Sequence, residues 1–285
     1  MRLRLGAHLS IASGLEKAAR TAAQIGANTF QYFTRNPRGG KARAIGGEEI
    51  SRWLSLRRDL DLYPVAGHLP YTVNPAAPPG RQRDFARLVL TEDWERVRSL
   101  GGEYVVAHPG RHGGNREEAI GHLAGLIEET VLAAPAGGPV LLLETMACQR
   151  GELGSLEDLL EVFKRLSWPP QVGICLDSAH LFEAGWDLRT PAGCDELAAR
   201  LENYFGLEKI KLLHLNDSLT PLNSRRDRHA LIGTGELGEK GITSIVNHSF
   251  LGSLPLILET NVEKYSDYAL EIKKVKALLR NAAPF

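Results

Sequence analysis

The chain has 285 residues, with 34 basic and 34 acidic side chains that cancel to a formal net charge of zero. A hydrophobic fraction of 43% is ordinary for a globular protein and too high for intrinsic disorder. No apolar run reaches the roughly 20 residues that a membrane helix needs, and the first residues lack the pattern of a secretory signal peptide. The three cysteines are widely spaced and predict neither a disulfide framework nor a Cys-x-x-Cys metal clip. These features predict a soluble cytoplasmic protein.

The zero net charge hides an uneven distribution. Residues 35–43 contain Arg35, Arg38, Lys41 and Arg43 and no acidic side chain. Taken alone, a basic run of this kind is typical of a solvated loop. A contact with phosphate groups is the alternative, so the zero net charge does not exclude a nucleic-acid partner.

Short, nearly continuous apolar runs recur along the chain, as is typical of strands that are buried on both faces of a parallel sheet. We predict eight strands, over Leu3–Leu9, Thr29–Phe33, Tyr63–His68, Tyr104–His108, Val140–Met146, Val172–Leu176, Lys211–Asn216 and Pro255–Thr260. The segments between them carry apolar residues at helical spacing. We predict helices over Ser13–Ile25, Glu117–Val131, Leu156–Leu166, Glu196–Tyr204 and Tyr268–Leu279, and a further helix through Phe85, Leu88, Val89, Val97 and Leu100.

Eight successive strand–helix units in a chain of this length predict a single (β/α)₈ TIM barrel domain that spans residues 1–285. The alternative is an open, doubly wound α/β sheet, which usually has fewer strands and a glycine-rich phosphate loop after the first strand. Only the isolated Gly14 follows the first predicted strand, which favours the barrel. Proline- and glycine-rich stretches at 74–80 and 134–139 are interpreted as loops, not as linkers between domains.

Histidine and carboxylate side chains stand at or just after the ends of six consecutive predicted strands. They are His68, His108, Glu144, Asp177 with His180, His214 and Glu259, and Asp227 and His229 follow the seventh strand. In a barrel the C-terminal strand ends converge on one rim, where active sites of this architecture form. Converging carboxylates repel one another and burial raises their pKa values, so cations are needed to keep them ionised. The pattern therefore predicts a metal centre.

These nine donors exceed what one catalytic ion needs, because such an ion takes about three protein ligands and keeps one position open. The set suits two or three ions with at least one bridging carboxylate. The mixture of imidazole and carboxylate favours Zn²⁺ or Mn²⁺ over Mg²⁺. Clustered divalent ions attract an anion, activate water and stabilise both oxygens of an in-line displacement at phosphorus. We therefore expect a hydrolytic phosphodiesterase.

The segments that carry these residues follow a fixed order: Gly6-Ala7-His8-Leu9-Ser10, His68-Leu69-Pro70-Tyr71, His108-Pro109-Gly110, Leu143-Glu144-Thr145, Gly173–His180, His214–Ser218, Asp227-Arg228-His229, Ile232–Gly235 and Glu259-Thr260. Together they resemble the endonuclease IV family of apurinic/apyrimidinic (AP) endonucleases, also called AP endonuclease family 2, along nearly the full chain. The resemblance implies a site for three zinc ions, with Mn²⁺ able to occupy part of it. One ion would be bound by His68, His108 and Glu144, a second by Glu144 as a bridge with Asp177, His214 and Glu259, and the third by His180, Asp227 and His229.

The resemblance further implies a DNA repair hydrolase of the deoxyribonuclease IV type. A metal-bridging hydroxide would attack the phosphorus 5′ to an abasic site in double-stranded DNA, with Glu259 and Glu144 as the catalytic carboxylates. The products would be a 3′-hydroxyl and a 5′-deoxyribose phosphate, and trimming of 3′ ends is expected as well. We expect the chain to act as a monomer with no membrane partner.

Contacts with DNA are implied at three positions. Asn36 and Arg38 lie where the family has a recognition loop whose arginine enters the minor groove, and Tyr71 matches a residue that wedges against the abasic gap. Extruding a nucleotide costs least where stacking is already weak, so such a wedge favours abasic sites. With this resemblance the basic run at residues 35–43 is expected to contact phosphate. Thr72 and the two glycines after Arg38 depart from the family pattern in the same loops.

Two other functions are compatible with the same architecture. A xylose isomerase-like sugar isomerase or epimerase has a similar rim but needs only one or two ions, which would leave His68, His108, Asp227 and His229 without a role. A DNA-binding barrel with purely structural metals is the non-enzymatic alternative. A closed barrel has its own packed core and does not need rim metals to fold, so we favour the hydrolase.

Overall fold

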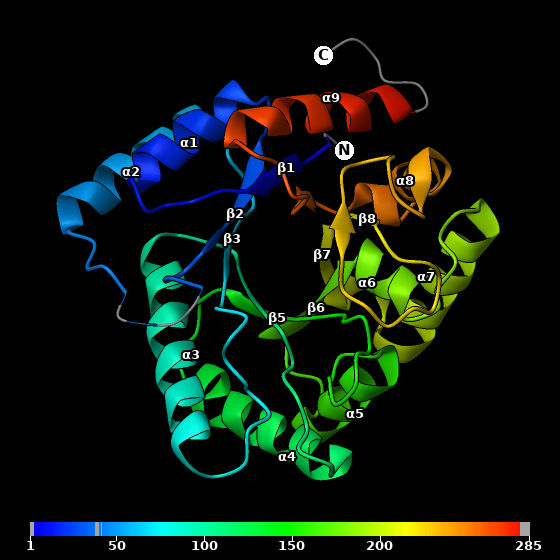
Figure 1. Cartoon of the computed structure of the whole chain (residues 1–285). Helices are drawn as coiled ribbons and strands as arrows, with labels where there is room; N and C mark the ends of the chain where they lie inside the picture. The colour runs from blue at the N-terminus through cyan, green and yellow to red at the C-terminus, as the bar shows by residue number, and fades with distance from the viewer. Residues whose placement is uncertain (1–2, 38–39, 41, 280–285) are drawn as a thin grey trace.

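Eight parallel strands close into a barrel within the residues that the computed structural model describes, 3–37, 40 and 42–279 (Figure 1). The barrel strands are β1 Leu5–His8, β2 Thr29–Phe33, β3 Val65–His68, β4 Tyr104–Ala107, β5 Val140–Glu144, β6 Val172–Asp177, β7 Ile210–His214 and β10 Leu256–Leu258. Around the barrel they follow the order β1, β10, β7, β6, β5, β4, β3, β2, and β1 also pairs with β2. The predicted TIM barrel is confirmed, and each of the eight predicted strands is present.

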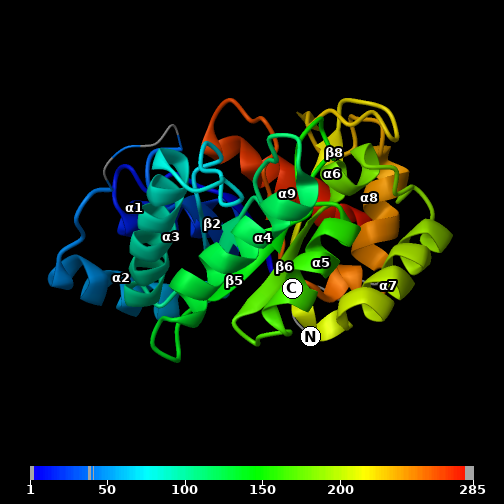
Figure 2. The ribbon, with the colours of Figure 1, turned by 90° about the horizontal axis from the view of Figure 1, so that it is seen from below.

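Helices follow the strands and surround the barrel (Figures 1 and 2). Their bounds are α1 Leu15–Gln24, α2 Gly47–Asp59, α3 Arg81–Ser99, α4 Arg116–Ile127, α5 Leu156–Leu166, α6 Ser178–Glu183, α7 Pro191–Phe205, α8 Gly238–Asn247 and α9 Tyr268–Leu278. Short helical turns are η1 Glu128–Leu132, η2 Leu207–Lys209, η3 Leu251–Ser253 and η4 Tyr265–Asp267. Within the described residues no helix combines the length and the apolar character needed to cross a membrane.

Three of these helices, α2, α6 and α8, are not predicted from the sequence pattern. The helix α2 buries only Trp53 and Arg57, so its apolar periodicity is weak. The helix α8 begins at Gly238 and contains Gly241, and glycine is a poor helix former. The helix α6 continues directly from β6 and is buried along its whole length, so its composition does not distinguish it from the strand.

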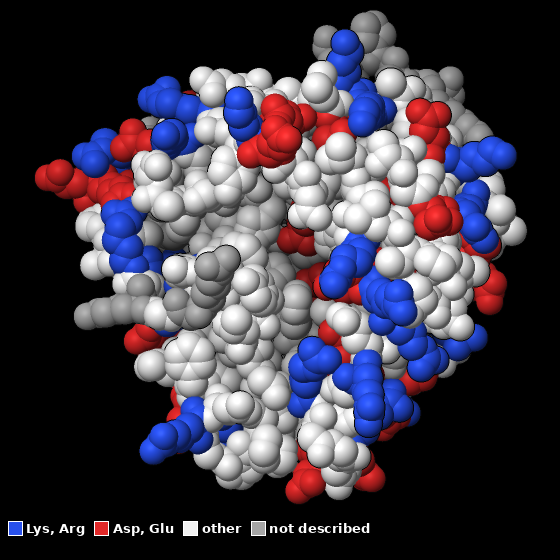
Figure 3. All heavy atoms as spheres, viewed as in Figure 1, with Lys and Arg blue, Asp and Glu red and all other residues white. Residues whose placement is uncertain are grey.

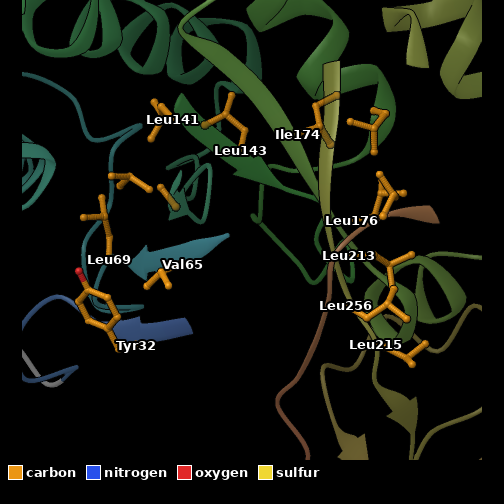
Figure 4. Close-up of a cluster of buried hydrophobic side chains, with 14 of the residues drawn as sticks. Tyr32, Val65, Leu69, Leu141, Leu143, Ile174, Leu176, Leu213, Leu215 and Leu256 are labelled. Carbon is orange, nitrogen blue, oxygen red and sulfur yellow. The ribbon is translucent and has the colours of Figure 1, made fainter. Parts of the chain in front are cut away.

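The apolar strand residues supply two separate cores. Side chains that point into the barrel form an inner cluster of Ala66, Val106, Leu142, Cys175, Leu212 and Ile257. Their neighbours along the strands belong to the outer core that includes the helices, and Figure 4 shows Leu141 and Leu143 of β5 among them. Burial on both faces is the reason why the strands are continuously apolar. Packing of the outer layer is close, because a Cβ atom at Gly67 of β3 would lie only 2.4 Å from Cγ2 of Val97 on α3.

The connections that follow the strands gather on one face of the barrel, at the top of Figure 2. One of them, residues 217–230, contains the short antiparallel strands β8 Asp217–Ser218 and β9 His229–Ala230. We call this segment the arm. The arm lies after β7 and packs against α6, so this face of the barrel carries a small structural unit that the sequence pattern does not predict.

Candidate metal centre

The nine predicted donor side chains converge on the C-terminal face of the barrel. His68, Glu144, Asp177 and His214 end strands β3, β5, β6 and β7, and His108 and Glu259 directly follow β4 and β10. His180 comes from α6, while Asp227 and His229 come from the arm. A cavity of about 370 Å³ opens over these residues. Figure 3 shows the hollow at the centre of this face, with acidic side chains within it.

A first group consists of His68, His108 and Glu144, whose potential ligand atoms all lie within 4.8 Å of one another. Nε2 of His68 lies 3.1 Å from Oε2 of Glu144, and Nε2 of His108 lies 3.4 Å from the same oxygen. Nδ1 of His68 donates a hydrogen bond to the carbonyl of Leu69 at 2.6 Å. This outer hydrogen bond directs Nε2 toward the centre, as is usual for histidines that bind a metal.

A second group shares Glu144 with the first and adds Asp177, His214 and Glu259. Nδ1 of His214 lies 3.1 Å from Oε2 of Glu259, 3.3 Å from Oε1 of Glu144 and 3.8 Å from Oδ2 of Asp177. The two oxygens of Glu144 therefore face different groups, which is the arrangement that a bridging carboxylate requires.

A third group lies between α6 and the arm. The structure gathers Asp177, His180 and His229 within 4.8 Å, whereas the predicted set is His180, Asp227 and His229. Asp227 lies beside them, with Oδ1 3.3 Å from Nε2 of His180 and 3.6 Å from Nε2 of His229. Asp177 thus adjoins both the second and the third group.

Two buried nitrogen atoms in the third group lack hydrogen-bond partners within the described part of the chain. They are Nε2 of His180 and Nε2 of His229, although carboxylate oxygens lie nearby. Nδ1 of His180 donates to the carbonyl of Thr145 at 3.0 Å, which points Nε2 into the centre. An unsatisfied buried nitrogen is costly, and a bound cation removes that cost. The donor set and its orientation therefore fit metal ions.

The electrostatics of the centre couple its carboxylates to its histidines. Burial opposes ionisation of Glu144, but the charges of His214 and His108 outweigh it and hold the Glu144 pKa well below its usual range. Burial also opposes ionisation of Glu259, but the charge and the hydrogen bond of His214 outweigh it and hold the Glu259 pKa well below its usual range. Burial opposes protonation of His180, yet Asp177 and Asp227 raise its pKa well above the ordinary value. The buried carboxylates thus require positive charge, which protonated histidines or divalent cations can supply.

Gln31 supports the centre from β2 and is not predicted from the sequence. Its buried side chain donates through Nε2 to Oε1 of Glu259 at 2.7 Å and accepts through Oε1 from Nε2 of His214 at 3.0 Å. Its Nε2 also lies 3.0 Å from Nδ1 of His8. Burial lowers the pKa of His8, which Glu259 only partly opposes. The sequence signal for Gln31 is a polar residue between the aromatic residues Phe30 and Tyr32 of a predicted strand.

Asn216 and Asp217 follow β7 together but have different roles. Asn216 donates to Oδ2 of Asp177 at 2.7 Å and accepts from the backbone N–H of Glu259 at 2.8 Å, so it orients two predicted metal ligands. Asp217 points away from the centre and accepts from the backbone N–H groups of Gly235 and Leu237. It stabilises the turn before α8.

Two of the three residues predicted to contact DNA, Tyr71 and Asn36, lie at the edge of the same face. Tyr71 is 52% exposed, lines the cavity over the centre and packs edge-on against Phe33 at a ring distance of 6.2 Å. Asn36 is exposed in the loop after β2. Arg38 lies outside the described residues. The hydroxyl of Thr72 donates to the carbonyl of Pro37 at 3.2 Å, which joins the loops that follow β2 and β3.

The prediction that the whole basic run contacts phosphate is wrong for Arg35. Its side chain is buried and donates to the buried Asp93 of α3 through Nε and Nη2, with N–O distances of 2.6 to 3.1 Å, and to Glu92 at 2.9 Å. Arg43 pairs with Glu49 at 2.6 Å. A buried arginine with carboxylate partners anchors its loop and offers no free charge to a ligand.

Exposed arginines outside the predicted loop line another part of this face. They are Arg111 after β4, Arg150 after β5, and Arg225, Arg226 and Arg228 in the arm. Figure 3 shows basic side chains along one side of the central hollow. Arg111 and Arg150 are isolated in the sequence, and the three arginines of the arm are interrupted by Asp227, so no acid-free basic run identifies this set.

Comparisons with known proteins find relatives along nearly the whole chain. The family model of the xylose isomerase-like TIM barrels matches residues 19–282. A protein named probable endonuclease 4 from Moorella thermoacetica is 56% identical over 276 residues, which cover 97% of this chain and 99% of the relative. A protein of the same name from Heliobacterium modesticaldum is 42% identical over 97% of this chain and 99% of its own length.

Solved structures give the same result at lower identity. Endonuclease IV from Thermus thermophilus superposes with a TM-score of 0.84 at 29% identity, over 96% of this chain and 98% of its own. A D-tagatose 3-epimerase-like protein superposes with a TM-score of 0.71 at 21% identity, which shows a shared barrel fold only. The full-length relatives therefore support the hydrolase and not the sugar isomerase or epimerase. The chain is an endonuclease, a metal-dependent hydrolase, and belongs to the endonuclease IV family of AP endonucleases.

Proposed function

We propose that this protein hydrolyses the phosphodiester bond 5′ to an abasic site in double-stranded DNA, leaving a 3′-hydroxyl and a 5′-deoxyribose phosphate. The observation that carries the proposal is the set of three adjoining donor groups, linked through Glu144 and Asp177, in a cavity open to the surface. One ion could not use all of these donors, because a catalytic zinc takes about three protein ligands. Three zinc ions per chain, replaceable in part by manganese, match the number of groups.

Zinc ions would be held by His68, His108, Glu144, Asp177, His180, His214, Asp227, His229 and Glu259. When bound, they would activate water near neutral pH and supply positive charge for the phosphate. Glu259 is only partly buried and borders the cavity, so its carboxylate can orient the nucleophile and accept its proton. Glu144 is deeply buried and keeps two groups at a constant separation. The chain's own catalytic carboxylates are thus Glu259 and Glu144.

The rim residues hold the duplex in this proposal. Tyr71, with half of its side chain exposed beside the cavity, wedges against the gap of the abasic site. Asn36 and Arg38 contact the groove next to the lesion, and the arginines of the arm neutralise backbone phosphates. Extrusion of the lesion then places its phosphate over the centre.

We also propose the same centre for trimming of blocked 3′ ends, since that reaction breaks the same type of bond. Residues 1–285 act in this proposal as one barrel domain, as a monomer, in the cytoplasm and without a membrane partner. A monomer is sufficient because one chain contributes all nine donors, eight of them in the three groups and Asp227 beside the third.

One experiment tests the activity directly. A duplex with a single abasic analogue is incubated with the protein, the ends are mapped, and metal content is measured on the same preparation. Cleavage 5′ to the lesion with more than two transition-metal ions per chain is expected. Cleavage on the 3′ side would overturn the proposed reaction, and one ion or none in an active preparation would overturn the three-metal centre.

A further inference from the structure

A buried carboxylate that the proposed mechanism does not use lies beneath the arm. Glu183 ends α6 and its side chain is fully buried. Its Oε2 has no hydrogen-bond partner among the residues that the structure describes, and burial raises the pKa of the carboxyl to about 7. Burying an incompletely satisfied carboxyl group costs free energy, so its presence at this position requires a reason.

The contacts of Glu183 all lead to the arm. Its Oε1 accepts from the hydroxyl of Ser218 at 2.6 Å, from the hydroxyl of Thr220 at 3.3 Å and from the backbone N–H of Arg228 at 3.2 Å. Ser218 and Thr220 stand where the arm leaves the barrel, and Arg228 stands where it returns. One carboxylate oxygen therefore joins the two ends of the arm.

The backbone of α6 holds the tip of the arm as well. The carbonyl of Glu183 accepts from the N–H of Arg225 at 2.9 Å, and the carbonyl of Phe182 accepts from the N–H of Asn223 at 3.1 Å. Asn223 and Arg225 both have left-handed backbone conformations, with φ of 60° and 55°. This conformation is unfavourable for arginine, so the contacts with α6 offset a local cost.

The position of Arg228 connects these contacts to the metal centre. Arg228 lies between Asp227 and His229, whose side chains face His180, and His180 precedes Glu183 by three residues on α6. The hydrogen bond from the Arg228 N–H to Glu183 therefore constrains the backbone between the predicted metal ligands Asp227 and His229. The structure assigns Glu183 as a positioning residue that holds the arm so that Asp227 and His229 complete the third metal group. This role rests on the proposed three-metal function and adds a residue that is not itself a ligand.

The test compares Glu183→Ala with Glu183→Gln, which keeps an acceptor oxygen at the same place. The Ala variant is expected to lose bound zinc from the third group on dialysis, with an affinity lower by about 10- to 100-fold. Hydrogen–deuterium exchange of residues 219–229 should rise in the same variant, and kcat should fall more than KM changes. The Gln variant should retain the zinc, the protection of the arm and most of kcat.

Asp93→Asn is the matched control. Asp93 is also a fully buried carboxylate on a helix, and it anchors the rim loop after β2 through Thr34 and Arg35. This loop is far from the arm, because β2 lies opposite β6, the strand that leads into α6, in the barrel order. Although this replacement destabilises the fold, the folded Asp93→Asn protein should keep the wild-type zinc content and exchange in residues 219–229, which separates loss of stability from loss of arm position. If Glu183→Ala does not fold, the double variant S218A/T220V removes two of the three groups that donate hydrogen bonds to Oε1 of Glu183. Its zinc content and its exchange in residues 219–229 are then compared with the wild type in the same way.

Wild-type zinc content and exchange in a folded Glu183→Ala or S218A/T220V variant would overturn the positioning role. The same holds if the Gln variant loses as much zinc as the Ala variant, because an acceptor oxygen would then not be what matters. Both readouts are independent of substrate. An inactive wild-type protein on the abasic duplex would overturn the proposed function instead, so the two failures are distinguishable.

Discussion

The side-chain amide of Gln31 donates a hydrogen bond to Oε1 of Glu259 across 2.7 Å. Its carbonyl oxygen accepts from Nε2 of His214, so one amide determines both the orientation of Glu259 and the nitrogen that His214 presents to the centre. A glutamine suits this position because it is both donor and acceptor without charge.

Gln31→Glu should therefore be harmful although it preserves size and shape. The new carboxylate cannot donate to Glu259 when ionised, and it adds a like charge beside it. We expect kcat or zinc affinity to fall about 10- to 100-fold, measured by steady-state incision and metal analysis. Gln31→Met is the control for packing alone. If the Glu variant equals the wild type, the amide has no orienting role.

Glu259→Gln should reduce turnover by about 100-fold or more, because the proton acceptor at the cavity is lost. Binding of an abasic duplex should remain close to wild type, since Glu259 lies below the exposed rim residues that we propose to contact DNA. Single-turnover incision and fluorescence anisotropy separate the two quantities. Unchanged turnover would remove Glu259 from the mechanism.

Tyr71→Ala should weaken the preference for abasic over intact duplex. The ring is 52% exposed, so its removal leaves little cavity and should change the unfolding free energy by less than about 1 kcal/mol. Stacking of an aromatic side chain on bases contributes about 1–3 kcal/mol, and we expect a selectivity loss in that range. Competition binding with both duplexes measures it, with zinc content as the control. Full selectivity in this variant would refute the wedge.

Asp93→Asn should destabilise the protein by about 3–5 kcal/mol, because it leaves the buried Arg35 without its charged partner. Glu92→Gln is the comparison. It also removes a partner of Arg35, but Glu92 is 53% exposed, so a loss of about 0–1 kcal/mol is expected. Urea denaturation of both variants gives the two values. Equal effects would contradict the anchoring role of the buried pair.

The raised pKa of Glu183 predicts that the unfolding free energy falls as the pH rises, whereas a salt-bridged carboxylate has the opposite effect. Burial raises its folded-state pKa to about 7 from an ordinary 4.5, so between these values the folded protein binds more protons than the unfolded chain. The contribution to stability is therefore present below about pH 4.5 and is lost as the pH rises through 7, by up to about 3 kcal/mol.

Comparison with Glu183→Gln at each pH isolates this effect, because titration of the other groups is common to both proteins. The unfolding free energy of the wild type minus that of the variant should fall between about pH 4.5 and 7 and then level off. A constant difference across this range would show that Glu183 does not titrate with a raised pKa.

The barrel and the donor residues could be predicted from the sequence for the same reason. Strands buried on both faces must be apolar throughout, so a histidine or carboxylate at their ends stands out, as His68, Glu144 and His214 do. A parallel barrel then brings every C-terminal strand end to one face, whatever the separation along the chain. Neither step requires knowledge of side-chain packing.

Other features were decided only by the tertiary structure. The sequence presents Arg35 as one of four bases in an acid-free run, yet its charge is neutralised by Asp93, 58 residues further along the chain. Gln31 and Glu183 are ordinary residues in sequence, and only the fold places one beside Glu259 and the other beneath the arm. Composition reports how many charges a chain has, whereas the partner of each charge depends on contacts between distant segments. The sequence alone therefore determined the barrel and the kind of chemistry at its rim, and the folded chain determined which polar groups face that chemistry and which support it.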